Sequence, residues 1–431
     1  MRAAIWFLSL FGVAVALAIA AQHPGGLVSV FLTGYRVDIS INLSILLIVS
    51  LFILLYVATR GISTLLALPK IAKRWRLLQR ERSTHESLLN ALEQLMTGRY
   101  VRSIGAATQA VESANSLKEL SQDEISTPKY LNQLIGLAHL IGAESAHELR
   151  DFKNRDQHLQ ALLAKFPATE APGAGEIREA SLLSAARWSL SEADPLAALG
   201  WLGELKGGSA RRTLALRLKL KSDRRAKHQR AALETARLLN KHGAFSQIAA
   251  TGLLKSLCIS SIEDCSEPEQ LIQIWRMFNQ NERALPDVAV HAGEKMVSLN
   301  GSPQTALTWI SPVWDLYIQK PGTLSAQQIE KLIQTLSSVL KALGPDKNWL
   351  AKIDHARAAR PADPNLQFLS AMVCMHNGLW GKAQQLMQEA SNNLIKPSMK
   401  KQAWLALGQL ATQRGDEAEA LLIWKKIALI A

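Results

Sequence analysis

The sequence holds few cysteines and no familiar catalytic motif. Cys258, Cys265 and Cys374 are too few and too oddly spaced for a disulfide framework or a paired C-x-x-C metal site, which fits a reducing compartment. No P-loop, H-E-x-x-H, G-x-S-x-G, EF-hand or G-x-G-x-x-G pattern occurs, and the ten histidines are scattered. We therefore expect no enzymatic activity, no metal site and no resident cofactor.

Charge is missing from two stretches near the N-terminus, residues 3–21 and residues 39–59. Each can cross a hydrocarbon core of about 30 Å at about 1.5 Å per residue. We predict a transmembrane helical hairpin over residues 1–60, with residues 22–38 as its loop. The alternative is a cleaved signal peptide, because "AIAAQ" resembles a cleavage site. The placement of the later chain is the same in both cases.

Acidic residues are nearly missing after the second stretch, where Glu81 is the only acid between residues 60 and 82. Because positive charge stays on the cytoplasmic side, the loop should face the periplasm and the C-terminal domain the cytoplasm, in a multi-pass protein of a bacterial inner membrane. The basic juxtamembrane segment, residues 61–82, either lies on anionic lipid or simply continues into the first cytoplasmic helix. Its basic residues, with the one before it, are Arg60, Lys70, Lys73, Arg74, Arg76, Arg80 and Arg82.

Strand-like alternation occurs only in the predicted loop. Val28, Val30 and Leu32 alternate before the Thr33-Gly34 pair, and the alternation resumes in "YRVDIS" after it. This pattern predicts a short β-hairpin.

Helix-forming residues dominate after Ser83, and two C-terminal stretches, "HNGLWGKAQQLMQEA" and "QRGDEAEALLIWKKIA", share one pattern. A turn glycine between helices and small residues at their contact predict antiparallel helix pairs. The W-x2-L-G run at Trp404 is typical of a tetratricopeptide (TPR) repeat. The signature residues are Gly378, Leu379, Trp380, Gly381, Lys382, Ala383, Trp404, Leu407, Gly408, Gly415 and Ala420.

The predicted fold is therefore all-α: a transmembrane hairpin, then a TPR-like right-handed α-solenoid over residues 83–431. About eight or nine helix pairs would line a concave groove. Weaker copies of the turn lie at Gly98 and Gly301, and the Pro/Gly-rich run at residues 166–176 is the best internal joint. The recurring tryptophans are interpreted mainly as core residues, including Trp380.

Two groups of side chains invite a ligand interpretation. Cys374 and His376 in "VCMHNG" could ligate haem iron, but a small hydrophobic role on the inward helix face is favoured for Cys374. Cys258 and Cys265 would face together only on an unbroken helix, and Pro268 with its acidic neighbours favours a loop.

A second basic cluster surrounds a single acid, Asp223. Either it is a solvated helix face, or it meets an acidic protein partner, anionic lipid or the propionates of a porphyrin; we favour a protein partner. No nucleic-acid module is visible, so nucleic acid is not expected despite the sequence pI of 9.7. The cluster comprises Arg211, Arg212, Arg217, Lys219, Lys221, Arg224, Arg225, Lys227 and Arg230.

The run "LWGKA", together with "YRVDIS", "LPKIAKRWR" and "MTGRYVRS", resembles the HemY family of proteobacterial inner-membrane proteins. The resemblance implies a membrane-anchored TPR protein associated with a late step of haem (protoheme) biosynthesis, with haem-synthesis enzymes as partners. It does not imply the flavin-dependent protoporphyrinogen oxidase of the same name, which needs a G-x-G-x-x-G loop.

The leading functional hypothesis is a non-catalytic scaffold that gathers proteins of porphyrin synthesis at the membrane. One alternative is a tetrapyrrole carrier or sensor that binds haem directly. Another is an unrelated membrane assembly adaptor.

The charge pattern makes a topology prediction. A phosphatase fused near Thr33 should be active because the loop faces the periplasm, whereas one fused at Ala431 should be inactive. Enzyme assays on whole cells carrying each fusion measure this, and the reverse pattern would overturn the orientation.

Overall fold

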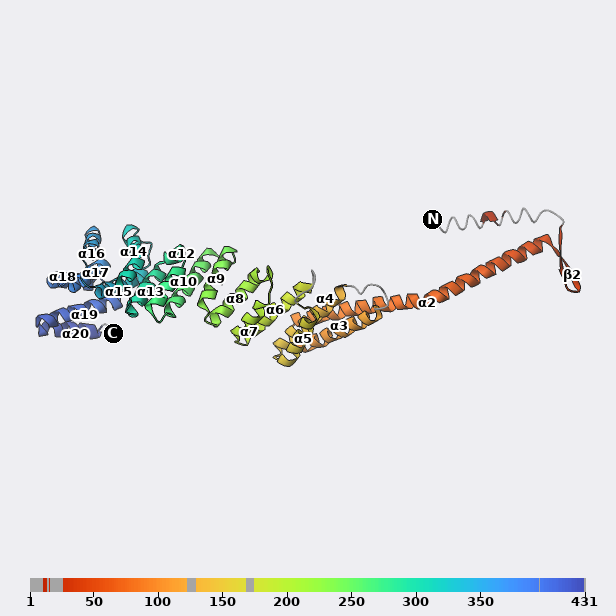
Figure 1. Ribbon diagram of the computed structural model, residues 1–431, viewed down its shortest axis with the longest axis horizontal. Coiled ribbons are helices and arrows are strands. Elements are labelled where there is room, and N and C mark those ends of the chain that lie inside the picture. The colour runs from red at the N-terminus through yellow and green to blue at the C-terminus, as the bar shows by residue number, and fades with distance from the viewer. Residues whose placement is uncertain are drawn as a thin grey trace. The chain divides into compact units, whose positions relative to one another are not determined.

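The computed structural model describes residues 11–13, 15, 26–121, 129–167, 174–394 and 396–429. Within these ranges the structure is helical apart from one two-stranded sheet, as Figure 1 shows. The chain divides into two compact units, Met1–Arg178 and Glu179–Ala431. The predicted transmembrane helix at residues 3–21 falls almost wholly outside the described residues.

The predicted β-hairpin is confirmed. Strands β1 (Leu27–Leu32) and β2 (Tyr35–Ser40) are antiparallel, and Leu32 pairs with Tyr35 across the turn. Gly34 has φ +100°, a conformation that a residue with a Cβ rarely adopts. The register also pairs Val28 with Ile39, so the alternating apolar residues share one face of the sheet.

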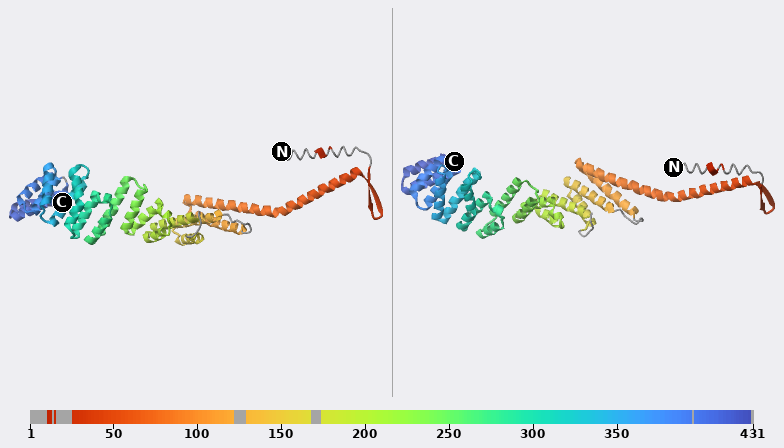
Figure 2. Two further views of the ribbon diagram at one scale, coloured as in Figure 1. Left: turned by 45° about the horizontal axis from the view of Figure 1, so that its top comes forward. Right: turned by 90° about the horizontal axis from the view of Figure 1, so that it is seen from above.

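The second apolar stretch differs from its predicted bounds. Ile39 belongs to β2, and helix α2 begins at Ile41 and continues to Met96. Ser40 ends the strand and caps the helix, since its hydroxyl accepts a hydrogen bond of 3.3 Å from the Leu43 amide. Figure 2 shows α2 as one continuous helix, so the basic residues 61–82 are part of this helix and not a separate segment.

Part of α2 is long and apolar enough to cross a membrane. This part, Ile41–Ile62, has 22 residues, none of them buried within the structure, and a helix of that length measures about 33 Å. It is the one such span found among the described residues. Beyond it the helix continues through Pro69 into contact with α3.

The first unit continues with α3 (Tyr100–Ser121), α4 (Lys129–Glu148) and α5 (Phe152–Lys165). Buried hydrogen bonds join α2, α3 and α4. Ser103 of α3 donates to the Ala91 carbonyl of α2 at 2.7 Å, and the hydroxyl of Ser145 in α4 donates to that of Ser103 at 2.8 Å. Ala107 is fully buried nearby, so small residues let these helices approach closely.

The helices from residue 174 onward are mostly short and follow one another along the chain (Figure 1). They are α6 (Ala174–Ser191), α7 (Pro195–Gly203), α8 (Thr213–Arg225), α9 (Gln229–Lys241), α10 (Gln247–Glu263), α11 (Pro268–Met277), α12 (Gln280–Arg283), α13 (Pro286–Ser298), α14 (Pro303–Gln319), α15 (Ala326–Leu343), α16 (Lys347–Ala359), α17 (Pro364–His376), α18 (Trp380–Asn393), α19 (Pro397–Arg414) and α20 (Glu417–Leu429).

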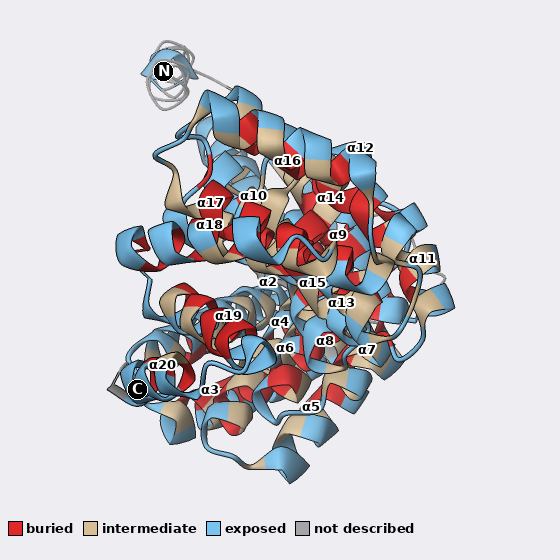
Figure 3. Ribbon diagram, turned by 90° about the vertical axis from the view of Figure 1, so that its left-hand side faces the viewer, coloured by how far each residue is buried: buried red, intermediate tan, exposed pale blue. Residues whose placement is uncertain are grey.

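One hydrophobic core runs through the second unit from Leu216 to Ile427, and Figure 3 shows its buried residues between the helices. Helices that are not consecutive in the chain also meet in this core: Trp275 of α11 stacks on Trp309 of α14, with ring centroids 4.7 Å apart. The predicted all-α array of packed helices is therefore confirmed. Each pair is stabilised by its neighbours.

The turns between helices have the backbone conformation that the repeat pattern predicts. Gly378 has φ +75° and Gly415 has φ +77°, and each follows the end of a helix. Gly408 has another role, because a Cβ there would lie 3.3 Å from the Trp424 ring. Ala383 is fully buried at a helix contact.

The core interpretation of the tryptophans is partly wrong. Trp188 and Trp309 are buried, but Trp380 is 47% exposed and Trp424 is 42% exposed. Trp380 is the first residue of α18 and lies beside a cavity of about 500 Å³, which Leu410, Gln413 and Arg414 of α19 also line. One face of the Trp424 ring is covered by Gly408, which has no side chain to enclose it further. Trp201 and Trp404 are half-buried.

A histidine pair joins α4 to α5 in the first unit. His139 and His158 approach with their Nδ1 atoms 3.0 Å apart. Burial first, and then the charges of His158 and Lys165, lower the pKa of His139 to about 4, and burial lowers the pKa of His158. The folded unit therefore favours two neutral rings.

The contact between α4 and α5 should weaken in acid. Because the folded pKa of His139 lies below its ordinary 6.5, its stabilising effect is complete above pH 6.5 and is lost as the pH falls towards 4. Hydrogen exchange in α4 and α5 should accelerate over that range. A His139→Gln/His158→Gln variant should lose most of this acid dependence, and an unchanged dependence would contradict the assignment.

Replacing the buried small residue of α18 should open the C-terminal helices locally. Ala383→Arg forces a long charged side chain into a filled contact, at about 3 kcal/mol or more. Limited proteolysis should then cut α17 to α20 first and leave α2 to α5 protected. Gln385→Arg is the matched control, because Gln385 is exposed on the same helix; equal sensitivity of both variants would contradict the assignment.

Candidate partner-binding site

Four basic side chains of α8 surround a cavity of about 460 Å³ in the second unit. They are Arg217, Lys221, Arg224 and Arg225, and all four are exposed. The other lining residues are apolar: Leu220 of α8, and Phe245 in the connection between α9 and α10. We call this site the cationic cavity.

Helical spacing brings these cations together. Arg217, Lys221 and Arg224 lie four and three residues apart, so their side chains emerge on one face of α8. Leu216 and Leu220 are buried in the core. Because the apolar side of α8 packs into the core, its basic side is held facing the cavity.

Backbone carbonyls from outside α8 hold two of the arginines in place. Arg217 donates from Nη2 to the Ala244 carbonyl at 3.0 Å, and its guanidinium lies 5.9 Å from the centroid of the Phe245 ring. Arg225 donates from Nη1 to the Leu190 carbonyl of α6. Neutral acceptors leave the arginine charge uncompensated, so the cavity keeps its attraction for an anion.

The single acid of the cluster is buried. The Asp223 side chain is 3% exposed, and its Oδ1 lies 3.8 Å from Nδ1 of His228. Burial raises the pKa of Asp223, while the charges of Lys219 and His228 act in the opposite direction. Because this carboxylate is in the interior, the exposed surface of α8 is almost purely basic.

All nine predicted basic residues are exposed, but only four gather around the cavity. Arg212 forms an ion pair of 2.9 Å with Glu179, and Arg230 forms one of 3.5 Å with Glu234. Arg211, Lys219 and Lys227 do not line the cavity. Phe245 was not predicted. The glycine two residues before it, Gly243, marks a chain reversal after α9 and has φ +65°, so it is a sequence signal that could have drawn attention to Phe245.

The low-priority haem candidates lie in the core of the C-terminal helices. Cys374 is fully buried, and burial raises the pKa of its thiol, so a thiolate ligand is disfavoured. His376 is half-buried, with its Nδ1 2.6 Å from the Met372 carbonyl. Burial lowers the pKa of His376. The small hydrophobic role of Cys374 is the one that the structure favours.

The predicted break between the other two cysteines is confirmed, because α10 ends at Glu263 and Cys265 lies in the connection before Pro268. Cys258 lies inside α10, which continues to Glu263, and Cys265 follows just after that helix. Both are buried free thiols, and burial raises the pKa of Cys258 to about 12. Among the described residues, no group of His, Cys, Asp and Glu could hold a metal ion.

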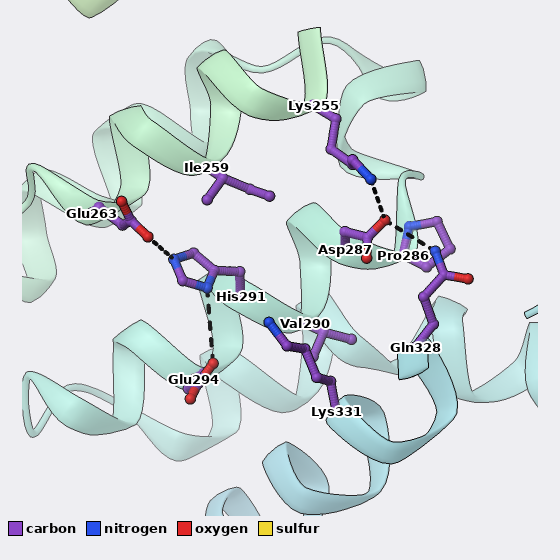
Figure 4. A pocket seen from close by; sticks show the side chains of 10 residues that line it. All are labelled: Lys255, Ile259, Glu263, Pro286, Asp287, Val290, His291, Glu294, Gln328 and Lys331. Atoms are coloured by element: carbon purple, nitrogen blue, oxygen red, sulfur yellow. Dashed lines mark hydrogen bonds and ion pairs between the residues drawn. The ribbon is translucent and has the colours of Figure 1, made fainter. Parts of the chain in front are cut away.

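A second cavity, of about 160 Å³, lies between α10, α13 and α15 (Figure 4). Its charges largely pair with one another. Lys255 lies 3.2 Å from Oδ2 of Asp287, which also accepts a hydrogen bond of 3.0 Å from Gln328. The ring nitrogens of His291 lie 3.5 Å and 3.8 Å from two glutamate carboxylates. The cationic cavity has no acid in its lining and is therefore the stronger candidate for binding an anionic group.

The membrane-proximal basic residues all belong to α2, where Arg74 and Arg76 are exposed beside the exposed Trp75. This continuity agrees with an anchor that continues into the first helix of the following bundle. Contact of this part of α2 with lipid stays a prediction.

Comparison with known proteins points to one family. The family model described as the HemY protein N-terminus matches residues 26–123. No curated protein matches the sequence.

Two solved structures are similar over much of the chain, but at low identity. The P58(IPK) TPR domain is 12% identical, with a TM-score of 0.21, covering 77% of this chain and 99% of that one. The structure of Naa15/Naa10 bound to HypK-THB is 13% identical, with a TM-score of 0.24, covering 82% of this chain and 64% of that one. These TM-scores are too low to support an argument about this chain.

Proposed function

Because the chain belongs to the HemY family through its N-terminal region, residues 26–123, we propose that it is a non-catalytic scaffold of haem biosynthesis. It is anchored in the membrane and acts in a late step of the pathway by holding an acidic protein partner. The observation that carries this proposal is the cationic cavity of α8, which has four basic side chains and no acid in its lining.

Membrane anchoring is supported by the family and by the apolar span Ile41–Ile62. In the proposed arrangement the inner membrane holds this span, and the basic part of α2 that follows lies on the cytoplasmic side. The partner is then an enzyme of porphyrin synthesis that works at or near the same surface. The proposal that the chain itself is not an enzyme rests on the absence of a catalytic motif from its sequence.

The chemistry of the cavity fits an acidic segment of a protein. Two arginines are oriented by backbone carbonyls, while Leu220 and Phe245 offer an apolar floor for a side chain between the partner's carboxylates. Exposed charge pairs give little affinity individually, but a uniform patch speeds encounter and makes binding sensitive to salt. Binding through this site should therefore weaken as ionic strength rises.

A tetrapyrrole carrier is the alternative that one observation favours. An aromatic ring beside several cations is also chemistry that suits the flat ring and propionates of a porphyrin. Titration of the purified protein with haem separates the two functions. Tight, saturable binding with a Soret shift that is lost in an Arg217→Ser/Phe245→Ala variant would favour the carrier and contradict a pure scaffold.

Charge reversal in the cavity should uncouple the pathway. Lys221→Glu/Arg224→Glu should reduce crosslinking between the chain and its partner by about tenfold or more, and it should raise late porphyrin intermediates, as loss of the whole protein should. Membrane content of the variant should be unchanged, because both side chains are exposed. Crosslinking in membranes with mass spectrometry, alongside porphyrin analysis, measures both effects.

The matched control is Arg211→Glu/Lys227→Glu, which makes the same charge change at two exposed positions outside the cavity. It should retain crosslinking and normal porphyrin levels. Equal loss in both variants would show that net charge, and not the cavity, attracts the partner. Normal behaviour of the cavity variant would refute the site.

A further inference from the structure

The last helix of the array has an apolar outer side. Ala420, Ile423 and Ile427 of α20 are buried on the side that packs against α19, next to which Figure 3 shows it. On other sides of α20, Leu421 is 58% exposed and Leu422 is 61% exposed, while the Trp424 ring, which packs on Gly408 of α19 at the edge of that contact, remains 42% exposed. The exposed side of a surface helix is ordinarily polar.

We propose that this outer side of α20 pairs with the same helix of a second copy of the chain. The two helices lie antiparallel about a two-fold axis at Leu421, so that the interface is made of one surface used twice. The choice of a second copy rests on how charge and size are distributed along α20 itself. This inference does not depend on the proposed scaffold function.

The charges of α20 are self-complementary in that arrangement. Glu417 lies four residues before Leu421 and Lys425 lies four residues after it, so the two-fold axis sets each Glu417 opposite Lys425 of the other copy. A parallel pair would instead set like charges together. The helix thus specifies its own orientation.

The other two charged side chains of α20 already have contacts within the chain. Glu419 forms an ion pair of 2.9 Å with Arg414, and the Lys426 ammonium lies 4.6 Å from the centroid of the Trp404 ring. Among the described residues, neither Glu417 nor Lys425 has an ion-pair partner. The charges left free are therefore those that the symmetric pairing would use.

Side-chain size follows the same symmetry. Ala418 lies three residues before Leu421 and Trp424 three residues after it, so each tryptophan meets an alanine of the other copy. A small residue opposite a large one lets two helices approach to the usual 8–10 Å. Leu421 of one copy then contacts Leu421 of the other, and this apolar centre of the interface is removed from water.

One helix pair buries a modest area, so the affinity in dilute solution should be low. Two copies held in one membrane meet at a much higher effective concentration. The proposed dimer therefore belongs to the membrane-bound chain and would bring two cationic cavities into one assembly. The experiment must use the full chain in membranes.

Disulfide crosslinking tests the pairing directly. Leu421→Cys places a thiol at the two-fold axis, and mild oxidation of isolated membranes should convert most of that variant to a covalent dimer. The native thiols at Cys258, Cys265 and Cys374 are all buried and should not interfere. Gln409→Cys, exposed on α19 away from the proposed interface, is the control and should stay monomeric.

Orientation is tested by Glu417→Cys. In the antiparallel pair the two copies of this position are about 12 Å apart along the helix axis, too far for a disulfide. Chains carrying Glu417→Cys should therefore crosslink to chains carrying Lys425→Cys but not to one another. Crosslinking of Glu417→Cys chains to one another would overturn the antiparallel pairing.

Charge swapping makes the test independent of folding defects. In the Leu421→Cys background, Glu417→Lys alone and Lys425→Glu alone should each lower the dimer yield by about tenfold, because like charges then oppose one another. Glu417→Lys/Lys425→Glu together should restore it. Failure of the double variant to recover, or a Leu421→Cys chain that remains monomeric after oxidation, would refute the proposal.

Discussion

Each helix of the second unit depends on its neighbours for burial. The core from Leu216 to Ile427 is continuous, and contacts such as the Trp275–Trp309 stack join helices that could not bury their apolar sides alone. Because the contacts are between neighbours, stability is distributed along the array. The helix surfaces outside this core can carry charged residues. The outer side of α20 is not covered by any other part of the described chain.

The long helix α2 is exposed in its first part and packed against other helices in its last part, and it is helical throughout. The span Ile41–Ile62 is strongly apolar and none of it is buried within the structure, whereas at Ala91 the same helix is buried against α3. Ser40 at its start ties it to the β-hairpin through a shared residue. The apolar span, which is long enough to cross a membrane, therefore continues into the packed bundle without an intervening linker.

The positive charge around the cationic cavity depends on the positions of the nearby carboxylates. The carboxylate of Asp223 is buried and that of Glu282 is bound by Arg237 at 2.6 Å, so neither faces the cationic cavity. The cations of α8 are held by carbonyl oxygens, which position an arginine but do not neutralise it. This arrangement keeps a long-range attraction for an acidic partner, which is the basis of the proposed function.

The sequence by itself determined the β-hairpin, the apolar span, the positive φ at Gly378 and Gly415 and the helical array, because each rests on local periodicity, turn chemistry or composition. It also located the basic cluster. Only the tertiary structure decided that four of those nine cations meet at Phe245, that Trp380 is exposed and that Cys374 is sealed inside. These outcomes depend on which neighbouring helix lies beside a residue, and a distance along the chain carries no information about that contact.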